Sequence, residues 1–256
     1  MSVENALGKV LLVGAGPGPA DLMTVRAVRA VESAQALLYD ALCSEEAIGL
    51  APAGCVRIQT GKRAGKPSMN QDEINRLMLR LARKGLRVVR LKGGDPSIFG
   101  RVGEEAAFLN GFGVETEVVP GVTAACAAAA QFGFPLTHRG EARRVVFTTA
   151  RLEAGRLSGD WSAAADPEAT LAVYMGGDVA GELAQRMIAA GRPADTPAVA
   201  VEKAGGEDAR LYPATLATLA ERLGEAGDGP LLIVVGEVAA QAHAAERLVG
   251  RARRRA

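Results

Sequence analysis

The chain has 256 residues, which is enough for one large domain or two compact ones. Its 30 Lys and Arg residues against 29 Asp and Glu residues leave a formal net charge of +1, so it lacks the broad basic field that attracts nucleic acid or an anionic membrane. Hydrophobic residues make up 48% of the chain and charged residues 23%, a composition typical of a folded globular protein rather than a disordered one.

The number and spacing of cysteines and histidines and the length of the apolar runs further restrict the class of protein. The three cysteines and two histidines form no C-x-x-C pair and no metal-ligand spacing, so we expect neither a disulfide framework nor a bound metal. No apolar run approaches the roughly 18 residues of a membrane-spanning helix, and the first residues lack the pattern of a secretory leader. These features predict a soluble, cytoplasmic protein that binds neither membrane nor nucleic acid.

Apolar segments of strand length alternate with helical stretches along the chain. The predicted strands are residues 10–13, 36–40, 56–60, 86–91, 114–119, 144–149, 170–175, 197–202 and 231–235. A helix is predicted over residues 72–84, where Ile74, Leu77, Met78 and Leu81 recur at helical spacing and Gly85 follows as a stop signal. Residues 151–168 are polar and irregular and predict a surface loop, and the alanine run at 127–130 indicates close helix packing.

Alternating strands and helices predict parallel strand pairing with crossover helices, and hence an α/β layer architecture. A break near Pro120 and Gly121 has five predicted strands before it and about as many after it, so we expect two α/β domains, residues 1–120 and 121–256. In such folds ligands bind in the crevice at the carboxyl ends of the strands. The loops that follow the predicted strands are therefore the first places to look for a site.

The first of these loops is rich in glycine and proline. Gly14 and Gly16 match the first two glycines of a dinucleotide-binding G-x-G-x-x-G loop, and Asp40 could imitate its acidic ribose ligand. Pro19 occupies the place of the third glycine, and Pro17 removes an amide that should contact a pyrophosphate. Two interpretations stay open here, a poor NAD site and a tight turn without any ligand.

A second glycine loop follows the predicted strand 86–91. Gly93 and Gly94 allow a ligand to approach the backbone closely, and Pro96 stiffens the turn that presents Asp95. This loop alone is weak evidence of function. It gains weight because it belongs to an ordered set of motifs.

The motifs are V-G-A-G-P-G at 13–18, Y-D at 39–40, G-K-R at 61–63, residues 71–75, R-L-K-G-G-D-P at 90–96, P-G-V-T-A at 120–124, P-L-T-H-R at 135–139, Y-M-G at 174–176 and V-V-G-E at 234–237. With this order and spacing, over about residues 8–240, the chain resembles the tetrapyrrole methylases, and within them the uroporphyrinogen-III C-methyltransferases. The resemblance implies two α/β domains facing a cleft, a homodimer, and S-adenosylmethionine as methyl donor with S-adenosylhomocysteine as product.

The resemblance also assigns residues. It implies that the methyl donor contacts Pro17, Gly93, Gly94, Asp95, Ile98, Thr123, Ala124, Met175 and Ala204. Because S-adenosylmethionine carries no phosphate, Pro17 in the first loop does not conflict with this cofactor. The implied reaction adds two methyl groups to uroporphyrinogen III and forms precorrin-2 by way of precorrin-1, in sirohaem- or cobalamin-type biosynthesis. Asp40 matches the family's proton acceptor and Lys62 its proton donor.

Recognition of the substrate needs local cations, because uroporphyrinogen III carries eight carboxylates while the chain has almost no net charge. Arg63, Lys66, Arg101 and Arg139 lie in or beside the matched motifs, and a guanidinium can hold a carboxylate through two hydrogen bonds. We therefore expect these four residues to bind the substrate, the alternative for each being a solvated surface charge.

Three other functions stay open at the level of sequence. A methylase acting on a later precorrin would share the same cofactor loops, although T-H-R at 137–139 and G-K-R at 61–63 favour uroporphyrinogen III. An NAD-dependent oxidoreductase would have to tolerate Pro19. A carrier would bind the methyl donor or a tetrapyrrole without turnover.

Overall fold

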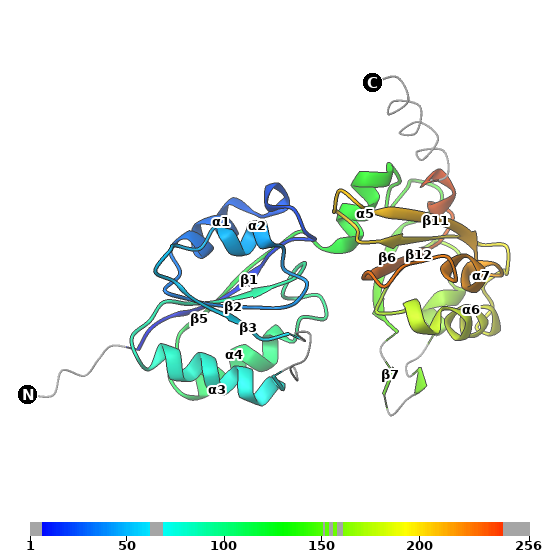
Figure 1. The fold of residues 1–256 in the computed structure, drawn as a ribbon. Coiled ribbons are helices and arrows are strands. Elements are labelled where there is room, and N and C mark those ends of the chain that lie inside the picture. Colours follow the sequence, from blue (N-terminus) through cyan, green and yellow to red (C-terminus); the bar gives the residue numbers. More distant parts are fainter. Residues whose placement is uncertain (1–6, 62–68, 151, 154–155, 158–160, 243–256) are drawn as a thin grey trace, which may run out of the picture. The chain divides into compact units, whose positions relative to one another are not determined.

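The computed structural model describes residues 7–61, 69–150, 152–153, 156–157 and 161–242. The chain divides into two units, Met1–Thr123 and Ala124–Ala256, each of which has its own sheet and helices (Figure 1). Within the described ranges, no helix is long and apolar enough to cross a membrane.

The N-terminal unit is built on a parallel five-stranded sheet in the order β3-β2-β4-β1-β5. Its strands are β1 (Val10–Gly14), β2 (Ala36–Tyr39), β3 (Val56–Gln59), β4 (Val88–Lys92) and β5 (Thr116–Val119). They confirm the five strands predicted in this half, with ends that differ by no more than two residues. β1 and β4 are neighbours although the chain leaves them in opposite directions across the sheet, so the two glycine loops meet at a topological switch point, where ligands bind in open α/β sheets.

Helices cover both faces of this sheet. One face is covered by α1 (Val25–Glu32) and α2 (Glu45–Gly49), and the 3₁₀ turn η1 (Ala20–Leu22) precedes α1. The other face is covered by α3 (Gln71–Ala82) and α4 (Val102–Gly111) (Figure 1). Alternate residues of the strands serve the two layers: Val13 and Leu37 pack toward α1 and α2, and Leu12 and Leu38 pack toward α3 and α4. This two-sided burial explains why β1 and β2 are largely apolar, whereas β3 at the edge of the sheet is more polar and more exposed.

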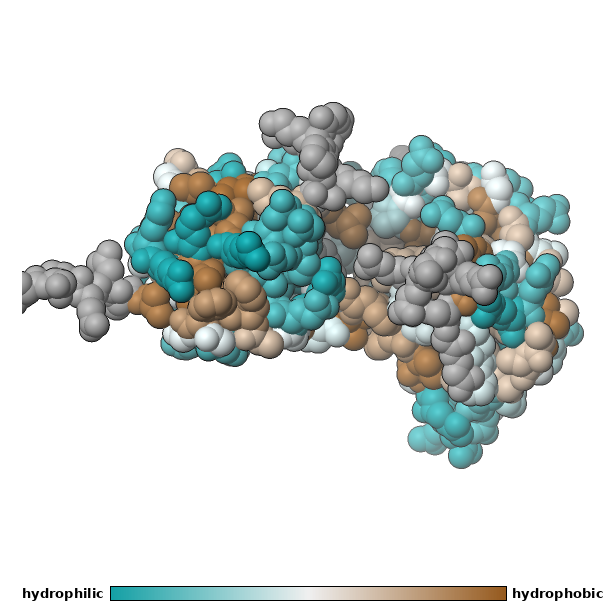
Figure 2. Space-filling model, turned by 90° about the horizontal axis from the view of Figure 1, so that it is seen from below, coloured by the Kyte–Doolittle hydropathy of each residue, from teal (hydrophilic) through white to brown (hydrophobic). Residues whose placement is uncertain are grey.

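α3 confirms the helix predicted from the periodicity of its apolar residues. Asn70 caps its first turn, because the Asn70 side chain accepts from the Glu73 backbone while the Glu73 carboxylate accepts from the Asn70 backbone. Gly85, with φ +77°, follows the last turn as a left-handed stop. Figure 2 shows the N-terminal unit from the side of α3 and α4, where hydrophilic residues surround patches of more hydrophobic ones. The buried stripe of α3 faces the sheet instead.

The C-terminal unit has a mixed sheet in the order β11-β10-β12-β9-β6. Its strands are β6 (Arg144–Thr149), β9 (Ala169–Tyr174), β10 (Pro197–Glu202), β11 (Arg210–Thr215) and β12 (Leu231–Val235). α5 (Ala124–Phe132) packs on one face, and α6 (Ala180–Ala189) and α7 (Leu219–Leu223) pack on the other with the 3₁₀ turns η2 (Ser162–Ala165) and η3 (Gly177–Val179) nearby. Within the alanine run at 127–130, Ala127 and Ala128 are buried, which agrees with the close helix packing expected there.

Two expectations for this half are wrong. Parallel pairing holds only between β6 and β9, whereas β9 with β12, β12 with β10, and β10 with β11 are antiparallel. β11 was not predicted, because Pro213 interrupts its apolar pattern, and proline is tolerated here since β11 is an edge strand. The short segment between β10 and β11 holds no helix, and so short a connection can join only antiparallel neighbours.

The predicted surface loop at residues 151–168 is also wrong in part. It contains a small antiparallel pair, β7 (Leu152–Glu153) and β8 (Arg156–Leu157), and the turn η2. Leu157, Trp161 and Ala164 are buried in the core of the C-terminal unit. Their spacing of four and three residues is that of a helix face, but Ser158, Gly159 and Asp160 between Leu157 and Trp161 disfavour a helix, so the pattern did not reveal their burial.

Candidate functional site

Three glycine-containing segments converge at the carboxyl ends of β1, β4 and β5. Gly16 and Gly94 exchange backbone hydrogen bonds, with N···O distances of 3.2 Å and 2.7 Å. A Cβ atom added to Gly14 would lie 2.7 Å from the Gly121 Cα and from the Gly94 carbonyl oxygen. Real Cβ atoms do not approach other atoms this closely, so only glycine allows the segments to meet. These three segments contain the residues predicted to contact the methyl donor in this unit, namely Pro17, Gly93, Gly94, Asp95, Ile98 and Thr123.

Asp95 ties two of these segments together. Its Oδ1 accepts a hydrogen bond from the Ser97 backbone at 2.8 Å, and its Oδ2 accepts one from the Gly121 backbone at 2.9 Å. The carboxylate therefore fixes the loop after β4 against the loop after β5. Gly94 has φ +68° and nothing within 4 Å of the position of a Cβ, so its backbone borders open space that a ligand can enter.

The C-terminal unit brings together the segments of its three predicted cofactor residues. Ala124 begins α5, Met175 follows β9, and Ala204 follows β10. Ala124 and Ala204 belong to one hydrophobic cluster with Tyr174, and the Tyr174 hydroxyl accepts a hydrogen bond from the Ala125 backbone at 3.3 Å. β9 and β10 both pair antiparallel with β12, so their carboxyl ends lie at the same edge of the sheet.

Backbone strain gathers in the same loops. Among the described residues other than glycine, Phe99, Arg101, Met175 and Lys203 have positive φ angles, between 52° and 58°. Such angles are costly for residues with a side chain and are often found at ligand sites. Met175 is also 49% exposed despite its apolar side chain. The strain lies within or directly beside the segments predicted to contact the methyl donor and the substrate.

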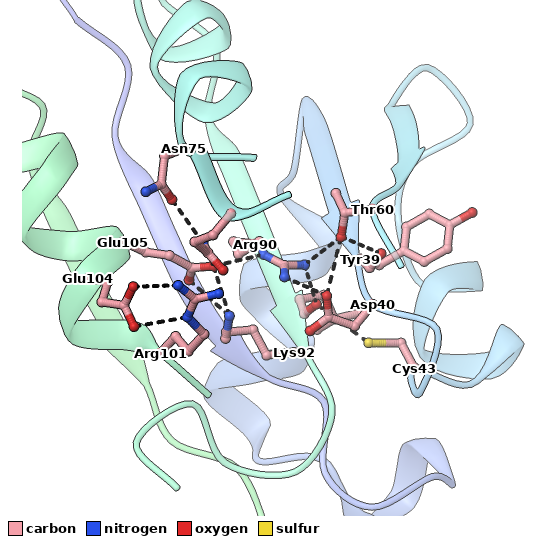
Figure 3. Close-up of polar contacts among 12 residues, drawn as sticks. Tyr39, Asp40, Cys43, Thr60, Asn75, Arg90, Lys92, Arg101, Glu104 and Glu105 are labelled. Atoms are coloured by element: carbon pink, nitrogen blue, oxygen red, sulfur yellow. Dashed lines mark hydrogen bonds and ion pairs between the residues drawn. The ribbon is translucent and has the colours of Figure 1, made fainter. Parts of the chain in front are cut away.

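A charged network lies beside the glycine loops in the N-terminal unit (Figure 3). Asp40, which follows β2, accepts hydrogen bonds at Oδ1 from the Thr60 hydroxyl at 3.2 Å and from Arg90 Nη2 at 2.5 Å. Arg90 Nε and Lys92 Nζ both donate to the carboxylate of Glu105 on α4. Arg90, Lys92 and Glu105 are buried, whereas the Asp40 side chain is 32% exposed. Asp40 is thus the member of the network that a substrate can reach.

The network also shifts two pKa values. Burial, together with the charge of Arg90, lowers the pKa of Lys92 despite the opposing effect of Glu105. Burial and the neighbouring Asp40 raise the pKa of the Cys43 thiol to about 12, so this thiol is protonated and poorly nucleophilic at neutral pH.

Sequence reasoning missed Arg90, Lys92 and Glu105 as members of a site. The available signal was the position of two cations inside the fully buried strand β4, because buried charges need partners of opposite charge. The partner could not be identified from spacing, since Glu105 lies on a helix further along the chain.

Comparison with known proteins identifies the family. The family described as Tetrapyrrole (Corrin/Porphyrin) Methylases matches residues 9–220. The chain belongs to the tetrapyrrole methylase family. This confirms the resemblance found in the sequence, and it leaves the NAD interpretation of the first glycine loop without support.

Sirohaem synthases are among the similar curated proteins. The chain is 47% identical to the enzyme of Chromobacterium violaceum over 232 residues, which cover 90% of this chain and 49% of that protein. It is 45% identical to the enzyme of Methylococcus capsulatus over 235 residues, covering 91% and 50%. The chain thus spans about half the length of the curated relatives it matches.

Solved structures confirm the tetrapyrrole methylase fold. A uroporphyrin-III C-methyl transferase from Thermus thermophilus, complexed with S-adenosyl homocysteine, aligns with a TM-score of 0.78 and 42% identity, covering 90% of this chain and 98% of that one. A cobalt precorrin-4 methyltransferase aligns with a TM-score of 0.81 and 30% identity, covering 90% and 95%.

The predicted proton donor and substrate residues of this tetrapyrrole methylase are only partly described. Lys62, Arg63 and Lys66 lie outside the described residues. Arg101 is exposed, and its guanidinium binds both carboxylate oxygens of Glu104 at 2.9 Å and 2.6 Å, which raises the pKa of Arg101 and lowers that of Glu104. Arg139 is exposed in the turn of the C-terminal unit that the His138–Ala142 bridge closes.

Proposed function

We propose that this chain is an S-adenosylmethionine-dependent C-methyltransferase that converts uroporphyrinogen III into precorrin-2 through precorrin-1. The observation that carries the proposal is the difference in identity among solved relatives, which is 42% for the uroporphyrin-III enzyme and 30% for the cobalt precorrin-4 enzyme. The identity of 45–47% to sirohaem synthases points to the same substrate. We further propose that the enzyme is a cytoplasmic homodimer.

The glycine loops suit S-adenosylmethionine, which supplies an electrophilic methyl group when bound. A sulfonium without phosphates needs close backbone contact rather than a row of amides, and the open space at Gly94 together with Pro17 in the first loop fits that requirement. We assign cofactor contacts to Pro17, Gly93, Gly94, Asp95, Ile98 and Thr123 in the N-terminal unit, and to Ala124, Met175 and Ala204 in the C-terminal unit. Asp95 contributes mainly by holding its loop, because both its oxygens accept from backbone amides.

Asp40 is the group proposed to accept a proton from the pyrrole as its ring carbon is methylated. Arg90 and Thr60 hold Oδ1, and within the described ranges no hydrogen bond reaches Oδ2, which leaves that oxygen for the substrate. Asp40 is assigned as the proton acceptor and Lys62 as the proton donor. Most of the acceleration comes from alignment, which is worth about 7–11 kcal/mol in well-oriented reactions.

The substrate's carboxylates are assigned to Arg63, Lys66, Arg101 and Arg139. Arg101 can bind a substrate carboxylate only by sharing its guanidinium with Glu104 or releasing it. Release of Glu104 replaces one charge-assisted pair of Arg101 by another, and the exposed Glu104 carboxylate returns to water, so the net cost is small.

A methylase for a later precorrin is the second candidate, and the TM-score of 0.81 to the cobalt precorrin-4 methyltransferase favours it. The experiment supplies purified protein anaerobically with S-adenosylmethionine and either uroporphyrinogen III or later precorrins. S-adenosylhomocysteine formation is measured for each acceptor. We expect uroporphyrinogen III to be the best acceptor. Turnover with only a later precorrin would transfer the assignment to that step, and no turnover with bound cofactor would indicate a carrier.

A further inference from the structure

Glu105 on α4 is a fully buried carboxylate that the proposed reaction does not use directly. Its side chain is 0% exposed, and it accepts hydrogen bonds from Arg90 Nε at 3.3 Å, from Lys92 Nζ at 2.9 Å and 3.0 Å, and from Gln71 Nε2 at 3.0 Å. Burial of an ionised carboxylate is costly unless charged partners surround it. Here two cations meet that requirement, so the surroundings of Glu105 are built for a negative charge.

Arg90 connects Glu105 to Asp40. Its guanidinium donates through Nε to Glu105, through Nη1 to the Thr60 hydroxyl at 3.1 Å, and through Nη2 to Asp40 at 2.5 Å. A guanidinium is planar and rigid, so fixing Nε also fixes the direction in which Nη2 points. Figure 3 shows the guanidinium between the two carboxylates, with Lys92 on the side of Glu105.

The charges of this network balance. Asp40 and Glu105 supply two negative charges, and Arg90 and Lys92 supply two positive ones. Without Glu105, Lys92 would lose its ion-pair partner, and Arg90 would lose the contact that keeps its Nε in place. Asp40 would then keep its charge but lose its fixed orientation.

We propose that Glu105 is a positioning residue for methyl transfer, which acts through Arg90 to hold Oδ1 of Asp40 and so to aim Oδ2 at the substrate. The inference rests on the proposed function, because it takes Asp40 as the proton acceptor. Glu105 touches neither substrate nor methyl donor in this account.

The test replaces the carboxylate by an amide of the same shape, Glu105→Gln. We expect kcat to fall about tenfold or more, within the range that proton transfer contributes, while the Kd of S-adenosylmethionine stays within about twofold. In an Asp40→Asn background the same substitution should change kcat by less than about twofold, since the residue through which it acts is already disabled. Glu105→Asp, which retains the charge, should fold and should restore part of kcat.

A matched control is Glu115→Gln, which removes an exposed carboxylate that pairs with Lys9 in the same unit. This control should leave kcat and Kd unchanged. The inference is overturned if Glu105→Gln keeps the wild-type kcat, if its loss persists undiminished in the Asp40→Asn background, or if cofactor affinity falls in parallel. If the wild-type enzyme is active and any of these results is found, only the proposed role of Glu105 is refuted. If the wild-type protein is inactive, the proposed function is refuted, and the inference about Glu105 with it.

Discussion

Gly14 lies where the loops after β1, β4 and β5 meet, so Gly14→Ala tests whether that convergence builds the cofactor site. The added Cβ would lie 2.7 Å from Gly121 Cα, Gly121 N and the Gly94 carbonyl oxygen. All three atoms belong to backbone, which cannot rotate away as a flexible side chain can. Overpacking of this kind costs about 1–3 kcal/mol, and at about 4 °C per kcal/mol the melting temperature of the N-terminal unit should fall by about 4–12 °C.

Cofactor affinity should fall in the same variant, because relief of the clash moves Gly94 and Gly121 apart. Differential scanning calorimetry measures the melting temperature, and isothermal titration with S-adenosylhomocysteine measures Kd. The matched control is Gly111→Ala at the end of α4, where an added Cβ meets nothing within 4 Å. The control should leave Kd unchanged and should not lower the melting temperature. Wild-type stability and affinity in Gly14→Ala would refute the convergence as the basis of the site.

Three further predictions concern single side chains. Asp40→Ala should lower turnover at least about tenfold with cofactor Kd unchanged in titration, and unchanged turnover would remove Asp40 from the mechanism. Because burial raises the pKa of Cys43 to about 12, iodoacetamide at about pH 8 should label exposed Cys126 well before Cys43 in the native protein, and both in urea, as read by peptide mass; equal native labelling would contradict this. The hydrogen bond from Tyr212 and those from two backbone amides lower the pKa of Glu202. The stabilisation that follows is present above its unfolded value of about 4.5 and is lost as pH falls through the lower folded value, so the melting-temperature gap between wild type and Glu202→Gln should narrow from about pH 6 to about pH 3, whereas a constant gap would argue against it.

Much of the fold could be predicted because the central strands of the N-terminal unit, β1, β2 and β4, are largely buried on both faces. An apolar run such as β1 signals its burial directly, and α3 shows both its period and its stop at Gly85. In the C-terminal unit the same reading failed for pairing direction, since a buried antiparallel strand such as β10 is as apolar as a parallel one. The direction depends on which strands are joined by short turns, and the edge strand β11 gives too weak a pattern to show that.

The candidate site was predictable only where motifs reveal it. The glycines at 14, 16, 93 and 94 were recognised from their motifs, and the structure requires glycine at 14 and 16 for close backbone approach and favours it at 94 because of a positive φ angle. Glu105 was not, because one glutamate among many in an α-helix carries no mark of its burial. Its role depends on the register that places α4 over Arg90 and Lys92, and that register is a property of the packed unit rather than of the local sequence.

The most direct test of the central claim counts the methyl groups transferred. Purified protein, uroporphyrinogen III and S-adenosylmethionine with a trideuterated methyl group are incubated without oxygen, and the tetrapyrrole is analysed by mass spectrometry. The account predicts a product with two labelled methyl groups, preceded by a transient species with one. A tetrapyrrole that stays unlabelled while the protein binds S-adenosylmethionine would contradict it.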